Sequence, residues 1–212
     1  MSPADASTEV LERIADYCAM RAVEFQSGMG ESQLERMVGF NVAEEFGAEF
    51  GESAGTLAVE RPVLADGRML PHEWLRTGFG RLLKTDGTSH GDDHFFPGRT
   101  DIAWDLAGAI IEWNLGNNAI DFMLERYRRR AGEDPRHRIA SYMLAYSVFR
   151  MAYCAMAAYT MRGSAEEPRL RRAWRHYRSV VAAQIRATRP IRLRAQVQRT
   201  WLPQATEEQA AS

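Results

Sequence analysis

The feature that most constrains this chain is a long apolar stretch, residues 139–161, that carries an arginine at its centre. About 20 apolar residues are enough for a helix to cross a bilayer. Arg150 argues against such a span, because an arginine at the bilayer centre costs about 2.5–3.5 kcal/mol on insertion scales. We therefore expect a helix buried among other helices, with Arg150 paired or reaching the surface, and no association with a membrane.

Apolar residues elsewhere also recur at spacings of three and four, the period of a helix with one buried face. Strand-like runs are confined to residues 56–63, 73–75 and 81–84, and the last two flank a glycine-bearing turn. The sequence therefore predicts a mainly α fold with a small β-hairpin. The expected helices cover residues 8–25, 32–46, 101–113, 119–130, 139–161 and 168–188, the last stopped by Pro190.

The length of 212 residues suits one well-buried core. We expect a single domain over residues 9–203, between flexible ends at 1–8 and 204–212 that are small and polar. Cys18 and Cys154 both fall in apolar helical patterns, as reduced thiols of a cytoplasmic protein would. Acidic residues near the N-terminus, such as Asp5 and Glu9, stand where a secretory signal would place positive charge.

Charge is unevenly placed along the chain, although the formal net charge is only −1. Acids dominate residues 1–60, whereas the segment from Arg169 to Arg199 is rich in arginine and contains no acid. Such a segment could meet nucleic acid, an acidic lipid surface or the acidic N-terminal part of the same chain. We favour the last interpretation, because no nucleic-acid-binding motif surrounds the segment.

Oxygen and imidazole donors cluster between Asp66 and Asp105, and this segment carries most of the chemical information. Turns beside a short hairpin can bring such groups together, as a divalent-cation site or an acid–base site requires. The donors are Asp66, His72, Glu73, Asp86, His90, Asp92, Asp93, His94, Asp101 and Asp105.

His90 and His94 have the spacing of a zinc-binding pair, since two histidines four apart share one face of a helix. Gly91 and the Pro97-Gly98 pair argue against a helix there, and no third soft ligand of known spacing follows. A metal-binding or hydrolytic protein stays open as an alternative. Its site would use His72, Glu73, His90, Asp92, Asp93 and His94.

Several pieces of the segment follow one another in a recognisable order. A loop at residues 67–73 contains a proline and a histidine, and short strands are expected after it at 74–75 and 82–83. Asp86 follows the second strand, and residues 101–107 read D-I-A-W-D-L-A. In this order the pieces resemble the aminoglycoside phosphotransferase and choline-kinase-like family, in the C-terminal lobe of its protein-kinase-like fold. There a catalytic loop, G-D-x-H-P-x-N, precedes two short strands, a metal-binding aspartate and a helix that starts with a pattern like D-x-A-x-D-L-A.

The resemblance implies a role for each matching residue. Asp86 and Glu73 would bind Mg²⁺, and Asp105 would support the catalytic loop by accepting hydrogen bonds from its backbone. Asp66 or His72 would contact the hydroxyl group of a small-molecule acceptor. An acid in the first turn of a helix is also stabilised by the helix dipole, which contributes about 0.3–1 kcal/mol and is compatible with the role of Asp105.

The chain also departs from the family pattern. The catalytic aspartate of the family falls on Arg68, and its metal-binding asparagine falls on Glu73. No glycine-rich phosphate loop precedes a helix, and the one lysine, Lys84, is the candidate for contact with a nucleotide. The resemblance therefore extends to the C-terminal lobe alone. ATP binding is expected only if an N-terminal lobe is supplied by a longer protein or a partner chain.

These observations favour a phosphotransferase-family domain of the small-molecule kinase type, incomplete for ATP-dependent transfer by itself. The first alternative is the metal-binding or hydrolytic protein described above. The second is a non-enzymatic interaction domain that uses the basic helix from Arg169.

Overall fold

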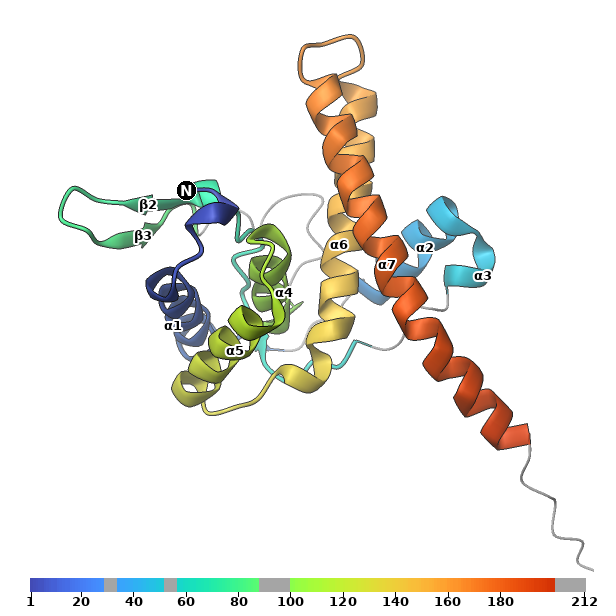
Figure 1. Cartoon of the computed structure of the whole chain (residues 1–212), viewed down its shortest axis with the longest axis horizontal. Helices are drawn as coiled ribbons and strands as arrows, with labels where there is room; N and C mark the ends of the chain where they lie inside the picture. Colours follow the sequence, from blue (N-terminus) through green and yellow to red (C-terminus); the bar gives the residue numbers. More distant parts are fainter. Residues whose placement is uncertain (29–33, 52–56, 88–99, 201–212) are drawn as a thin grey trace, which may run out of the picture.

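The computed structural model describes residues 1–28, 34–51, 57–87 and 100–200, with side chains up to residue 187. The described fold is mainly helical, as the apolar periodicity predicts (Figure 1). A short 3-10 turn, η1 (Pro3–Asp5), precedes the first helix, and another, η3 (Pro71–Glu73), precedes the hairpin. The α-helices are α1 (Thr8–Glu24), α2 (Leu34–Phe46), α3 (Ala48–Gly51), α4 (Ala103–Glu112), α5 (Asn117–Ala131), α6 (Arg136–Thr160) and α7 (Glu167–Thr200).

Four short strands form two antiparallel pairs within the described residues. The predicted hairpin is present, with β2 (Trp74–Arg76) paired to β3 (Leu82–Lys84), and it extends away from the helices in Figure 1. The first strand-like run is much shorter than expected: only β1 (Pro62–Val63) is a strand, and it pairs with β4 (Thr100–Asp101). This second pairing places β1 beside the residues that directly precede α4.

The core lies where α6 packs against α4, α2 and α7, while α1 packs against α5 and α4. Gly108 permits the close approach of α4 and α6, because a Cβ atom there would lie 2.8 Å from the Tyr146 ring. Next to it, the rings of Trp104 and Tyr146 meet edge to face, with centroids 5.3 Å apart. Helix α4 is consequently buried on nearly all sides.

Two differences from the predicted helix boundaries have a clear physical reason. Asp101 was expected inside a helix, but it lies in β4, because its backbone pairs with Pro62 and its carboxylate accepts from the Ala103 N–H at the start of α4. Helix α7 was expected to stop at Pro190, but it continues to Thr200. A proline removes one helical hydrogen bond and commonly bends a helix without ending it.

Arg150 in α6 is paired, as its position in an apolar stretch requires. Its Nε atom lies 3.1 Å from Glu112 Oε1 and donates to the Tyr177 hydroxyl at 3.2 Å, and its side chain is 14% exposed. Tyr146 and Tyr177 also donate to Glu112, each at 2.8 Å. Within the residues that the structure describes, no helix combines the length and the apolar character that crossing a bilayer requires.

We predict that Arg150→Ala destabilises the protein by about 3 kcal/mol, because it leaves the Glu112 carboxylate without a cation. Urea unfolding measures this change. The matched control is Arg175→Ala, an exposed arginine of α7 that should change the free energy of unfolding by less than about 0.5 kcal/mol. Equal losses in the two variants would show that the ion pair in α6 does not support the core.

Candidate functional site

The segment between β1 and η3, residues 64–70, is termed the β1–η3 loop. Asp105, in the first turn of α4, holds this loop by its backbone: Asp105 Oδ2 accepts from Asp66 N at 2.8 Å, and Oδ1 accepts from Gly67 N at 2.9 Å. Asp105 is fully buried. These are the hydrogen bonds to loop backbone that were expected of Asp105, and both of its oxygens take part.

Two tryptophans, Trp104 in α4 and Trp113 directly after its last residue, bind carbonyl groups of the β1–η3 loop. The Trp113 indole N–H donates to Met69 O at 3.0 Å, and the Trp104 indole N–H donates to Gly67 O at 3.5 Å. Both side chains are almost completely buried. The loop is thus held through its N–H groups and its carbonyl groups by α4 and the residue directly after it, which fixes its path closely.

Asp101, the first aspartate of the D-I-A-W-D-L-A segment, fixes the chain on the other side of β1. Its Oδ2 atom accepts from Glu60 N at 2.8 Å and from Arg61 N at 2.7 Å. Its Oδ1 atom accepts from Arg138 Nε at 3.0 Å, and both side chains are at most 2% exposed. The two aspartates of the segment therefore position the backbone before and after β1.

Lys84 joins the loop to the hairpin through two carboxylates. Its ammonium lies 3.2 Å from Asp66 Oδ1 and 3.1 Å from Glu73 Oε2, and it also donates to Thr85 O at 2.9 Å. The side chains of Lys84, Asp66 and Glu73 are 3%, 0% and 9% exposed. The structure therefore brings three of the predicted site residues together as a buried ion-pair network.

Two residues of α1 that sequence reasoning missed also belong to this site. The Tyr17 hydroxyl donates to Asp66 Oδ2, and the guanidinium of Arg21 donates to the carbonyl groups of Leu64 and Gly87. Gly87 lies so close that a Cβ atom there would be 2.7 Å from the Tyr17 hydroxyl oxygen. The available signal was Arg21 itself, a charged residue on the apolar face of the first helix that is only 3% exposed.

Burial and charge shift the protonation equilibria in this network. Burial, followed by the nearby charge of Asp66, raises the pKa of Asp105 to about 6, although the N–H groups of Asp66 and Gly67 oppose the shift. Burial and the Asp66 carboxylate also raise the pKa of the Tyr17 hydroxyl. The hydroxyl of Tyr17 therefore stays protonated at neutral pH and acts as a donor to Asp66.

Two further predicted site residues are exposed to solvent. His72 is exposed on η3, and Asp86 is exposed after β3 with a left-handed φ of 59°. Arg68, at the position of the family's catalytic aspartate, is half-buried. No group of three or more His, Cys, Asp or Glu side chains that could hold a metal ion occurs in the described part of the chain. The cluster of the alternative hypothesis, His90, Asp92, Asp93 and His94, lies outside the described residues.

No protein-family model matches the sequence, and no curated protein matches it. The described fold resembles part of a solved structure. The crystal structure of choline kinase LicA from Streptococcus pneumoniae is similar, with a TM-score of 0.54 and 13% identity over 84% of this chain and 66% of that chain. The structure of LicA in complex with AMP gives a TM-score of 0.48 at 12% identity, over 84% of this chain and 61% of that one.

The chain spans about two thirds of the length of LicA. At this level of identity the likeness shows the fold alone. It confirms the expectation of a mainly helical, kinase-like lobe with a small hairpin.

We predict that Asp105→Asn lowers the free energy of unfolding by about 1.5–3 kcal/mol at pH 7. Asparagine offers one carbonyl oxygen, so the amide N–H of either Asp66 or Gly67 would face its NH₂ group. Chemical denaturation measures the loss, and Asp121→Asn, at an exposed position of α5, is the matched control. A variant as stable as the control would mean that these two hydrogen bonds do not hold the loop.

The raised pKa of Asp105 predicts a pH dependence of stability. Since its folded-state pKa of about 6 exceeds the usual 3.8, the folded chain binds this proton more tightly than the unfolded chain. The contribution of Asp105 to stability is therefore largest below about pH 4 and declines as the pH rises through about 6. Asp105→Asn cannot titrate, so the stability difference between wild type and variant should shrink from pH 4.5 to pH 7.5 in urea titrations. A difference that grows with pH would contradict the assigned shift.

Proposed function

We propose that this chain is a phosphotransferase-family domain of the small-molecule kinase type that is incomplete for ATP-dependent phosphoryl transfer on its own. The choline-kinase-like fold supports the family. The hydrogen bonds from the β1–η3 loop to Asp105 support the loop arrangement that the family resemblance implies. The acceptor class is a small molecule with a hydroxyl group, and choline is the first candidate, because LicA is a choline kinase.

The observation that carries this proposal is the environment of Lys84. Phosphoryl transfer depends on cations that neutralise the phosphate groups and position them. Lys84 is the one lysine of the chain, and its buried ammonium is bonded to the carboxylates of Asp66 and Glu73. A lysine that is neutralised by two carboxylates can bind the phosphates of a nucleotide only if it breaks its contact with at least one of these carboxylates.

The same contacts bear on Mg²⁺, which prefers several oxygen ligands in octahedral geometry. Oxygens of Asp66 and Glu73 already accept from Lys84, so the residues present do not fit a magnesium ion unless Lys84 moves away. Binding of Mg²⁺ by Glu73 and Asp86 therefore requires a rearrangement of the network. ATP binding further requires phosphate-binding groups from an N-terminal lobe, in the same polypeptide or in a partner chain.

Burial separates the two candidates for contact with the acceptor hydroxyl. The Asp66 side chain is 0% exposed and is bonded to Tyr17 and Lys84, which gives it a structural role. His72 is exposed on η3, beside Glu73, so an acceptor can reach its imidazole. We assign the acceptor contact to His72 and the support of the loop to Asp105.

Calorimetric titration of the chain with Mg-ATP tests the proposal directly. We expect no saturation at concentrations below about 1 mM, which corresponds to a binding free energy weaker than about −4 kcal/mol. A dissociation constant in the low micromolar range would contradict the proposal, because it would show that this chain binds the phosphates of ATP without an N-terminal lobe.

Lys84→Met tests whether the ammonium takes the place of a divalent ion. The variant keeps the length of the side chain but leaves Asp66 and Glu73 without a cation, which should cost about 3–5 kcal/mol. Millimolar Mg²⁺ should restore part of the lost melting temperature in the variant and change the wild type little, with KCl at equal ionic strength as the control. If the wild type gains as much as the variant, Lys84 does not occupy the place of the ion.

A further inference from the structure

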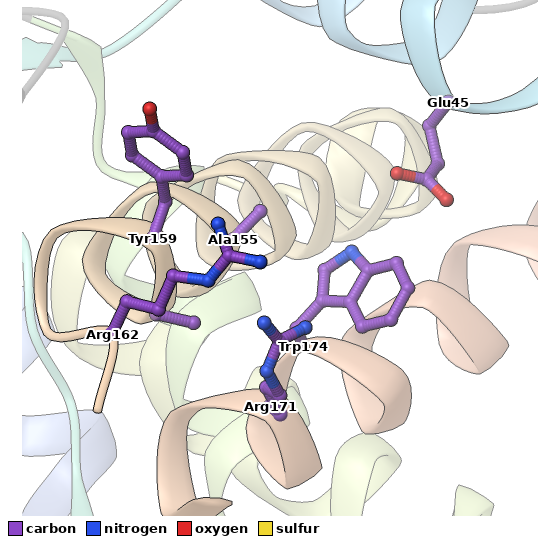
Figure 2. A pocket seen from close by; sticks show the side chains of 7 residues that line it. Glu45, Ala155, Tyr159, Arg162, Arg171 and Trp174 are labelled. Atoms are coloured by element: carbon purple, nitrogen blue, oxygen red, sulfur yellow. The ribbon is translucent and has the colours of Figure 1, made fainter. Parts of the chain in front are cut away.

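A pocket of about 280 Å³ lies between the C-terminal end of α6, the first turns of α7 and the end of α2 (Figure 2). None of the residues of the Lys84 network lines it. Its volume is close to the lower end of the range for small-molecule sites, about 300–1,000 Å³. The pocket is therefore large enough for a ligand with one ring and one acidic group.

Two arginines make this pocket positive. Arg162, on the turn after α6, and Arg171, on α7, both line the pocket, and Figure 2 shows their guanidinium groups directed toward the same space beside Trp174. The Nε atom of Arg171 donates a hydrogen bond to Glu167 Oε1 at 2.7 Å, and the terminal nitrogens of Arg171 make no hydrogen bond with any described residue. Arg162 forms no ion pair within the described ranges, but its charge acts on the same Glu167 carboxylate that pairs with Arg171. The two arginines therefore share one counter-ion, which leaves one net positive charge.

The one acid that lines the pocket does not neutralise these arginines. Glu45, from α2, lies across from Trp174 in Figure 2, and its carboxylate accepts from Arg178 of α7. The ring of Phe46 also lies 5.1 Å from the Arg178 guanidinium, which helps to keep Arg178 at α2. Arg162 and Arg171 therefore have only Glu167 as an acidic partner, and one net positive charge remains beside the pocket.

Trp174 supplies an aromatic surface beside the two arginines. Its indole nitrogen is buried, so the ring and not the N–H group is available to a ligand in the pocket. The apolar lining comes from Ala155, Ala158 and the ring of Tyr159, which is 76% exposed.

We propose that this pocket binds a small organic anion with a flat, apolar ring. Its carboxylate or phosphate group lies between Arg162 and Arg171, since guanidinium groups match the planar donor pattern that such anions require. Its ring packs against the rings of Trp174 and Tyr159.

Calorimetry with four probes tests the ligand class: phenyl phosphate, phenylacetate, neutral phenylacetamide and inorganic phosphate. At least one of the two aromatic anions should saturate the protein, with an affinity at least about tenfold higher than that of phenylacetamide or inorganic phosphate. The proposal is overturned if neither aromatic anion saturates, if phenylacetamide binds equally well, or if inorganic phosphate alone matches phenyl phosphate.

Variants then test the residues. Arg162→Gln and Arg171→Gln should each weaken binding of the aromatic anion at least about tenfold, while Trp174→Phe keeps the ring and should weaken it about threefold. Arg172→Gln is the matched control, because Arg172 is exposed on the same helix and does not line the pocket. The three arginine variants should melt like the wild type, since Arg162, Arg171 and Arg172 are all exposed. If Arg172→Gln weakens binding of the aromatic anion as much as Arg162→Gln does, the effect is general charge attraction, and the assignment of the anion to this pocket is overturned.

Discussion

The carboxylate of Asp105 is the group on which the geometry of the site depends. It accepts two backbone N–H groups of the β1–η3 loop while lying fully buried, so the loop can take only the path that satisfies both oxygens. This path places the side chain of Asp66 where Tyr17 and Lys84 reach it. Lys84 in turn reaches Glu73, and the hairpin is thereby tied to the helical body.

Keeping these charges buried is energetically costly, and the rise in the pKa of Asp105 to about 6 reflects that cost. A buried ion pair often adds little net stability compared with apolar side chains, but it fixes one arrangement of its members. In this chain the fixed members are the positions that the family resemblance assigns to the catalytic loop and the metal. Lys84 is the cation of this network, and it holds the carboxylates of Asp66 and Glu73 in place.

Arginine pairs explain how the uneven distribution of charge is accommodated. Acids of the first 60 residues meet arginines from later segments: Asp16 meets Arg126 at 2.8 Å, and Glu45 meets Arg178. Of these two arginines, Arg178 belongs to the basic segment from Arg169. Two other arginines of that segment, Arg169 and Arg171, pair with Glu166 and Glu167 directly before it. Arg150 is likewise paired with an acid inside the core, where it contacts Glu112, and the hydroxyl groups of Tyr146 and Tyr177 donate to the same carboxylate.

The sequence by itself determined the helical class, the hairpin and the burial of the Arg150 helix. These follow from local spacing, because apolar periods are properties of neighbouring residues. The hydrogen bonds of Asp105 to Asp66 and Gly67 span 39 and 38 positions, and only the family resemblance suggested them in advance. Only the tertiary structure decided that Lys84 pairs with Asp66 and Glu73, since those contacts join residues 18 and 11 positions apart across a hairpin and a loop. The same holds for Tyr17, which meets Asp66 from 49 positions away, because no local pattern specifies which helix covers a loop.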